Sequence, residues 1–134
     1  MVEIISIKTH GQGLYEITER VRQLLVASGV KEGLCSLLIQ HTSASLTIQE
    51  NADPSAQHDL ENWLNRLVPE GDAIYTHVFE GRDDMPAHIK AALTATTLSL
   101  PVKGGQILLG TWQGIFCWEH RHGSQLRQIA VHIG

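Results

Sequence analysis

The sequence predicts an α+β domain in which three helices pack against mainly antiparallel sheets. Two observations support this fold class. Apolar residues recur at helical spacing in three segments, and the last third of the chain consists of short strand-like runs joined by tight turns. The chain has 134 residues, with no linker and no internal repeat, so we expect a single domain over residues 1–134.

The N-terminal part is expected to form a strand, a helix and a second strand. Residues 2–8 alternate loosely between apolar and polar side chains, as an edge strand does, and Gly11–Gln–Gly13 ends the pattern. Apolar residues then recur at helical spacing from Tyr15 to Ser28, and Gly29 suits the left-handed residue that ends a helix. The run Leu34–Gln40 is apolar at nearly every position, which predicts a strand that is covered on both faces or lies across a core.

The middle of the chain predicts a strand, a helix and a further short strand. Residues 45–50 are strand-like, and Asp53–Pro54 is a helix start in which Asp caps exposed amides and Pro occupies the first turn. Pro69 ends this helix, and residues 73–79 are expected to form a strand. The helix should bury one apolar stripe, made of Ala56, Leu60, Trp63, Leu64 and Leu67.

The C-terminal part predicts a third helix followed by an antiparallel meander. The helix is expected over residues 86–95, after a polar loop that ends in Pro86. Turn signals at Lys103–Gly105 and Gln113–Gly114 separate the strand-like runs, because glycine-rich pairs favour tight hairpins. The predicted strands cover residues 98–102, 106–111, 115–119 and 126–133.

The composition argues against several classes of protein. The net charge is −4 and lysine and arginine do not cluster, so nucleic acid is not the expected partner. No segment approaches the roughly 20 apolar residues of a membrane span, so we expect no membrane association and a cytoplasmic location. Cys35 and Cys117 match neither a redox motif nor a zinc ribbon, so we interpret both as small buried residues.

The densest polar segment runs from His41 to Pro54, where a buried strand delivers side chains to the surface. His41 ends the apolar strand, and the hydroxyls of Thr42, Ser43 and Ser45 could bind a phosphate or hold the imidazole. The alternative is a capped strand end whose hydroxyls satisfy backbone groups. We favour a functional site because of the density of polar groups.

Acidic residues follow directly. Glu50, Asn51 and Asp53 offer oxygen ligands at a strand end and a helix start, which suits Mg²⁺ bound together with substrate phosphates. Asp53 is expected to serve partly as a cap, and Asp59 lies about 1.7 turns further along the helix. A solvated cap without any ion is the alternative.

Two further segments carry candidate groups. His88 and Lys90 lie near the start of the third helix but point about 200° apart, so we favour His88 as a ligand for an anion and expect Lys90 at the surface. Trp112 is expected to pack in the core or an interface. Glu119 and Arg121 share one face of a strand end, and His120 and His122 share the other. Only this histidine pair has a spacing compatible with Zn²⁺, which is therefore the alternative metal.

Five motifs stand in order along the chain: His41–Thr–Ser–Ala–Ser45, Glu50–Asn–Ala–Asp–Pro54, Tyr75–Thr–His77, Asp83–Asp–Met–Pro–Ala–His–Ile–Lys90 and Leu109–Gly–Thr–Trp–Gln–Gly–Ile115. Together they resemble the YjbQ-like family, also called the secondary thiamine-phosphate synthase family. The resemblance covers nearly the whole chain and implies a compact α+β domain that assembles as a homotrimer. It also implies a weak or secondary activity that joins a pyrimidine diphosphate to a thiazole phosphate.

The residues and the resemblance together give the hypothesis of a transferase acting on phosphorylated small molecules. The competing hypothesis is a histidine-rich protein that binds a metal or a small anion, with synthesis incidental. We assign catalysis to His41, His88 and Asp59, metal binding to Glu50 and Asp53, and substrate binding to Ser43, Asn51, Gln113, Glu119 and Arg121. His77 also matches the family pattern.

Overall fold

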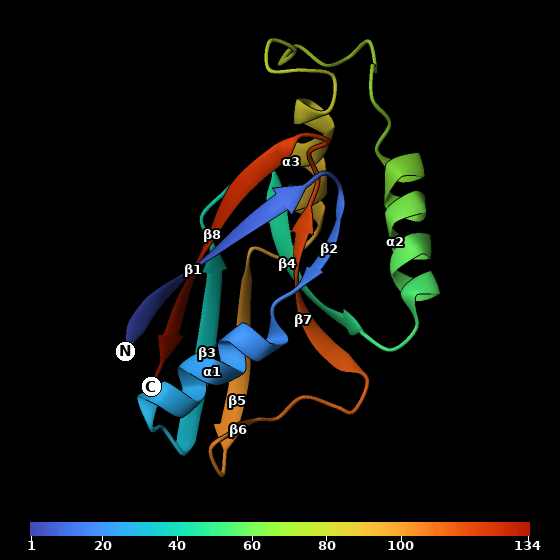
Figure 1. Ribbon diagram of the computed structural model, residues 1–134. Helices are drawn as coiled ribbons and strands as arrows, with labels where there is room; N and C mark the ends of the chain where they lie inside the picture. Colours follow the sequence, from blue (N-terminus) through green and yellow to red (C-terminus); the bar gives the residue numbers. More distant parts are fainter.

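A computed structural model describes all 134 residues and shows a single α+β domain with two antiparallel sheets (Figure 1). The predicted fold class is confirmed. The helices are α1 (Thr18–Ser28), α2 (Pro54–Leu67) and α3 (Asp84–Leu93). The strands are β1 (Val2–His10), β2 (Gly13–Glu16), β3 (Glu32–Ile39), β4 (Ala44–Glu50), β5 (Thr97–Lys103), β6 (Gln106–Ile107), β7 (Gln113–Glu119) and β8 (Ser124–Ile133).

The two sheets enclose the core. The larger sheet has the strand order β1-β8-β3-β5-β6, and the smaller one has the order β2-β7-β4. One apolar cluster joins the inward faces of both sheets with the buried side of α1, including Val21 and Leu25. Helix α3 packs beside β4, and α2 stands to one side, next to β2 (Figure 1). The ends of β4 and β7 therefore lie where α3 can reach them.

The N-terminal predictions are partly confirmed. Gly29 ends α1 with a left-handed φ of 71°. Residues 15 and 16, expected at the start of the helix, belong to β2, because residues 13–16 pair with the end of β7. Strand β3 is not covered on both faces: Leu34 and Leu38 are 45% and 46% exposed. Two covered faces are wrong for the single chain, because no layer of this chain lies over the outer face of the larger sheet. The alternative, a strand lying across a core, is confirmed, since Leu37 and Ile39 belong to the core cluster.

Two predicted strands are absent or shortened. Residues 68–83 form neither helix nor strand, so the strand expected at 73–79 is wrong. A turn at Asp72 begins this connection, since the Asp72 carbonyl accepts from the Tyr75 amide at 3.1 Å. Ile74 and Phe79 are 80% and 98% exposed, so the apolar residues that suggested a strand are not buried in this chain. The strand expected at 106–111 is limited to the two residues of β6.

Helix α2 begins as predicted but packs differently. Asp53 caps it by accepting a hydrogen bond from the Ser55 amide at 2.9 Å. Of the predicted stripe only Leu64 is fully buried, while Trp63 and Leu67 are 55% and 53% exposed. The stripe was therefore wrong in part, because α2 contacts the sheet along a narrow line. No helix in the structure combines the length and hydropathy of a membrane span.

Both cysteines are buried and unpaired, as expected. Burial raises the pKa of the Cys35 thiol to about 11. Burial, followed by the nearby charge of Glu119, raises the pKa of the Cys117 thiol to about 12. Both side chains therefore remain neutral thiols at physiological pH.

Candidate metal site at the start of α3

Three side chains converge beside the first turns of α3. Asp84 and His88 are four residues apart on the helix, and His77 reaches them from the preceding loop. The Asp84 Oδ2 atom lies 2.8 Å from His77 Nε2 and 3.1 Å from His88 Nε2. One donor atom of each residue lies within 4.8 Å of the others, a spacing that a single metal ion can bridge.

The His88 ring is oriented by its second nitrogen. His88 Nδ1 lies 2.9 Å from the Thr42 carbonyl oxygen, which can only accept a hydrogen bond. Nδ1 therefore carries the proton and donates it to Thr42, and Nε2 faces the cluster. A histidine that ligates a metal commonly uses its other nitrogen in this way, because the bond fixes both tautomer and ring direction.

Asp84 is anchored from the opposite side by Arg121. Asp84 is only 2% exposed, and its Oδ1 atom accepts from Arg121 Nη1 at 2.8 Å. The same guanidinium donates to Asp83 Oδ2 at 2.9 Å and to the Glu80 carbonyl at 2.8 Å. Burial acts to raise the pKa of Asp83, but the Arg121 hydrogen bond and the His122 amide lower it overall. The hydrogen bond to Asp83 in turn raises the pKa of Arg121.

His41 does not join this cluster, because its ring bonds to another part of the chain. Its Nε2 atom accepts a hydrogen bond from the Gln128 amide at 2.8 Å. Burial, followed by the charge of Arg127, lowers the pKa of His41, so the ring is neutral at physiological pH. The next residue, Thr42, is the one that contacts His88. The structure thus brings the end of β3 and the start of α3 together.

Two predicted substrate-binding residues of this region are buried. Glu119 is 0% exposed and Ser43 is 8% exposed. Both bind the side chain of Arg127, which is itself 3% exposed. Arg121, the third such residue, is half-buried and uses its guanidinium within the chain. These groups hold the site in shape instead of facing solvent.

The acidic residues lie at the other end of the smaller sheet. Ala44 pairs with Glu119 at one end of the β4–β7 ladder, and Glu50 pairs with Gln113 at the other. Six steps of about 3.3 Å separate these two ends by roughly 20 Å. The structure therefore divides the predicted residues into two groups within one chain. The distant group consists of Glu50, Asn51, Asp53 and Gln113.

The distant group is largely engaged in local contacts. Asn51 Nδ2 donates to Glu16 at 3.1 Å, and Gln113 Oε1 accepts from the Gly110 amide at 2.7 Å. Asp53 caps α2, and Asp59 is exposed on that helix. Within the chain, Glu50 and Asp53 have no third histidine, cysteine or carboxylate at metal-binding spacing.

Sequence reasoning did not single out Asp84 and misplaced Lys90. The four-residue spacing of Asp84 and His88 puts both on one helix face, and this signal could have identified the pair. Lys90 was wrongly expected at the surface: it is 2% exposed and donates to Asn65 Oδ1. Trp112 is 64% exposed in the single chain, so it does not pack in the core, and its packing in an interface stays a prediction.

Comparisons with known proteins agree over nearly the full length. Residues 3–134 match the family model described as UPF0047 protein YjbQ-like. The chain is 48% identical over 131 residues to UPF0047 protein sll1880 of Synechocystis, covering 98% of this chain and 89% of that protein. It is 46% identical over 129 residues to UPF0047 protein YjbQ of Escherichia coli O157:H7, covering 95% and 93%.

Solved structures show the same fold. An uncharacterized conserved protein from Clostridium acetobutylicum superimposes with a TM-score of 0.91 at 35% identity, covering 98% of this chain and 99% of that one. The conserved hypothetical protein TT1486 from Thermus thermophilus superimposes with a TM-score of 0.88 at 34% identity, with the same coverage.

Proposed function

The chain belongs to the UPF0047 YjbQ-like family, and on that premise we propose that it is a metal-dependent transferase of the thiamine phosphate synthase type. Its reaction centre is the cluster of His77, Asp84 and His88. The observation that carries the proposal is the convergence of three donor atoms within 4.8 Å, with His88 held by the Thr42 carbonyl.

The donor set indicates which ion the cluster suits. Two imidazole nitrogens and one carboxylate oxygen are the ligands of many catalytic Zn²⁺ sites, which leave a fourth position for water or substrate. Mg²⁺ prefers oxygen ligands and binds with substrate phosphates. We therefore place a Zn²⁺-type ion at the cluster and expect Mg²⁺ to arrive with the diphosphate, instead of residing on Glu50 and Asp53.

The reaction breaks a carbon–oxygen bond to the diphosphate and forms a bond from that carbon to the thiazole. A bound divalent ion supplies positive charge near the leaving pyrophosphate. Asp84 is held in place because Arg121 Nη1 donates to its other oxygen at 2.8 Å. Arg82, exposed in the loop between His77 and Asp84, forms no ion pair within the chain and is free to bind a phosphate.

The test compares two histidine variants. His88→Ala should weaken Zn²⁺ binding at least a hundredfold in calorimetric titration and abolish formation of thiamine phosphate from the two substrates. His58→Ala is the matched control, because His58 is exposed on α2 and its ring forms a hydrogen bond only with Asn62. Full synthesis by His88→Ala would show that the activity arises elsewhere.

A second candidate function is binding of a metal or small anion without turnover. The observation that favours it is that the two arginines linked to the cluster by hydrogen bonds are already engaged. Arg121 binds Asp83 and Asp84, and Arg127 binds Glu119. Zn²⁺ retained through purification without tags, together with no product from either substrate, would favour this function over the transferase.

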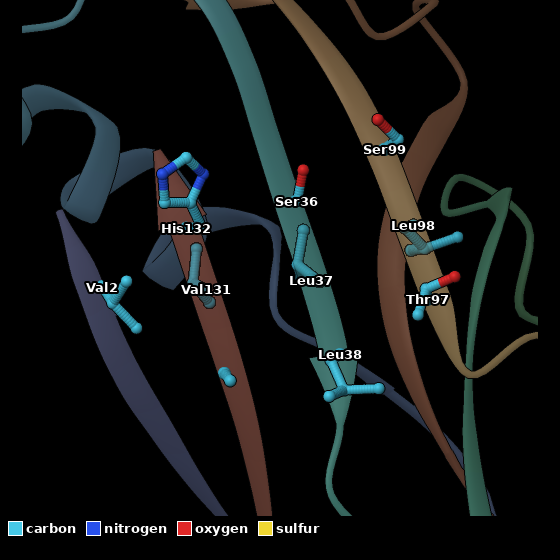
Figure 2. A pocket seen from close by; sticks show the side chains of 10 residues that line it. Val2, Ser36, Leu37, Leu38, Thr97, Leu98, Ser99, Val131 and His132 are labelled. Carbon is cyan, nitrogen blue, oxygen red and sulfur yellow. The ribbon is translucent and has the colours of Figure 1, made fainter. Parts of the chain in front are cut away.

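We also propose that the protein forms a homotrimer in the cytoplasm. Support comes from the outer face of the larger sheet, where a shallow hollow of about 390 Å³ lies over β1, β8, β3 and β5 (Figure 2). Cross-strand neighbours in this hollow include Leu38, Thr97 and Ala130, none of which is charged. An uncharged sheet face of this kind is suited to an interface with another copy. The two free thiols fit a reducing compartment.

A further inference from the structure

A buried ion pair is linked by hydrogen bonds to the residues around the proposed metal site. Glu119 is 0% and Arg127 is 3% exposed. Glu119 Oε1 accepts from Thr9 Oγ1 at 2.6 Å and from Arg127 Nε at 2.7 Å, while Oε2 accepts from Arg127 Nη2 and from the Arg121 amide at 3.1 Å. Both carboxylate oxygens are thus fully engaged. Burying two charges is costly, and well-packed apolar residues often stabilise a fold equally well.

The first connection to the metal site runs through Arg121. Glu119 fixes the backbone of Arg121 through its amide. The Arg121 side chain then donates to Asp83 at 2.9 Å and to Asp84 at 2.8 Å. The position of the Arg121 backbone therefore sets the direction of its guanidinium, and the guanidinium sets the rotation of the Asp84 carboxylate.

The second connection runs through the turn that follows β3. Arg127 Nη2 donates to Ser43 Oγ at 2.9 Å and to the Ser43 carbonyl at 3.2 Å. The preceding carbonyl, that of Thr42, accepts from His88 Nδ1 at 2.9 Å. Arg127 thus holds the segment that sets the tautomer and direction of the His88 ring.

We propose that Glu119 and Arg127 are positioning residues that hold two metal ligands, Asp84 and His88, in their binding geometry. The inference rests on the proposed function in treating these two residues as ligands. One buried pair reaches both, by separate routes through β7 and through the Thr42–Ser43 turn. A pair that only filled the core would affect stability but not the geometry of the ligands.

The main experiment measures Zn²⁺ affinity by calorimetric titration. Glu119→Gln replaces one acceptor oxygen with an amide that faces the donors of Arg127 or Arg121. We expect it to weaken Zn²⁺ binding about ten- to a hundredfold, the range typical of groups that orient ligands from behind. Ile129→Ala is the control: this 0% exposed core residue lies on the same strand as Arg127 and should lower the melting temperature while leaving affinity unchanged. Unchanged affinity in Glu119→Gln would overturn the proposal.

A second variant and a metal-free readout keep the test decisive. Arg127→Lys retains the charge but cannot bridge Glu119 and Ser43 as the guanidinium does. Nitrogen NMR shifts of the His88 ring should show a protonated Nδ1 in the wild type and a mixture in Arg127→Lys. If the wild type binds no Zn²⁺, the proposed metal function fails, and the NMR comparison alone decides the positioning role. Identical His88 spectra in both proteins would contradict the positioning role.

Discussion

Three consecutive residues, the last of β7 and the two that follow it, fasten this strand end to four other parts of the fold. Glu119 joins it to Thr9 of β1 and Arg127 of β8. His120 Nε2 lies 2.9 Å from Ser45 Oγ of β4, and Arg121 binds the start of α3. Each of these contacts uses a polar side chain in a largely dry environment, where hydrogen bonds specify one arrangement. The local geometry of the candidate site therefore depends on a few polar residues.

His120 is the most perturbed of these groups. It is 0% exposed, and its Nδ1 atom is the one buried side-chain nitrogen or oxygen without a hydrogen-bond partner. Burial, followed by the charges of Lys90 and Arg127, lowers the pKa of His120 to about 3. An unfolded histidine has a pKa of about 6.5, so between these values only the unfolded chain takes up the proton. The free energy of unfolding therefore carries no penalty from His120 above about pH 6.5, and it decreases as the pH falls below that value.

We predict that His120→Asn removes part of the acid sensitivity. The asparagine does not titrate. Its shorter side chain loses the bond that His120 Nε2 makes to Ser45, which lowers stability equally at both pH values. Between pH 7 and pH 5, the wild type should lose about 2 kcal/mol more unfolding free energy than the variant, since each pH unit below 6.5 costs up to about 1.4 kcal/mol. Urea denaturation at both pH values measures this. The control is His58→Asn, on the exposed surface of α2; equal losses in wild type and His120→Asn would contradict the prediction.

The β4–β7 ladder depends on a close approach at its far end. Gly114 is buried, and a Cβ atom there would lie 2.6 Å from Glu16 Oε2 and 3.0 Å from Asn51 Cβ. The Glu16 carboxylate cannot move freely, because Thr18 Oγ1 and Asn51 Nδ2 donate to it at 2.7 and 3.1 Å. Glycine is therefore required here for space and not for its backbone angles.

We predict that Gly114→Ala destabilises the fold by about 1–3 kcal/mol, the usual cost of overpacking. Gly123→Ala is the matched control, because a Cβ atom at Gly123 meets nothing within 4 Å. Urea denaturation of both variants gives the two free energies of unfolding. Equal stability of Gly114→Ala and Gly123→Ala would show that the Glu16–Asn51 contact is easily displaced.

Sequence patterns succeeded where a local chemical rule applied. Asp53 and Gly29 each satisfy the backbone at one helix end, so residue type alone identified their positions. Residues 73–79 failed because their apolar side chains suggest burial that this chain does not provide. Lys90 failed because its burial depends on Asn65 of a different helix, which no local pattern reports.

The candidate site shows the same division. The motif containing His88 was found by its composition, but the cluster needed the tertiary contacts of His77, Asp84 and Arg121. Glu119 was predicted to bind substrate. Nothing in the local sequence indicates that its carboxylate is enclosed by Thr9 and Arg127. Polar residues in the sequence marked the region, and only the fold separated the candidate ligands from the residues that contact them.

The whole molecule leaves one sheet face uncovered. Across the larger sheet, Ile4, Ala130, Leu38 and Thr97 form one row of cross-strand neighbours. The row formed by Val2, His132, Ser36 and Ser99 lies beside it (Figure 2). Neither row contains a lysine, arginine, aspartate or glutamate. A single charge in the first row should therefore act against any assembly that covers this face.

We predict that Leu38→Lys dissociates the proposed homotrimer. Leu38 is 46% exposed in the single chain, and burying an unpaired ammonium in an interface costs several kcal/mol. Sedimentation should give a trimer for the wild type and a monomer for the variant. Val26→Lys is the control, because Val26 is 78% exposed on α1, away from the sheet face, and should leave the assembly intact.

The same variant separates the two groups of candidate residues. His77, Asp84 and His88 form their cluster within one chain, so Leu38→Lys should bind Zn²⁺ as tightly as the wild type. Glu50, Asn51 and Gln113 lie at the other end of the smaller sheet, roughly 20 Å away by the strand rise, and reach a cluster only from a neighbouring subunit. If they contribute to catalysis, the monomer should lose synthesis while keeping its metal affinity. A monomer with full activity would show that the distant group takes no part in the reaction.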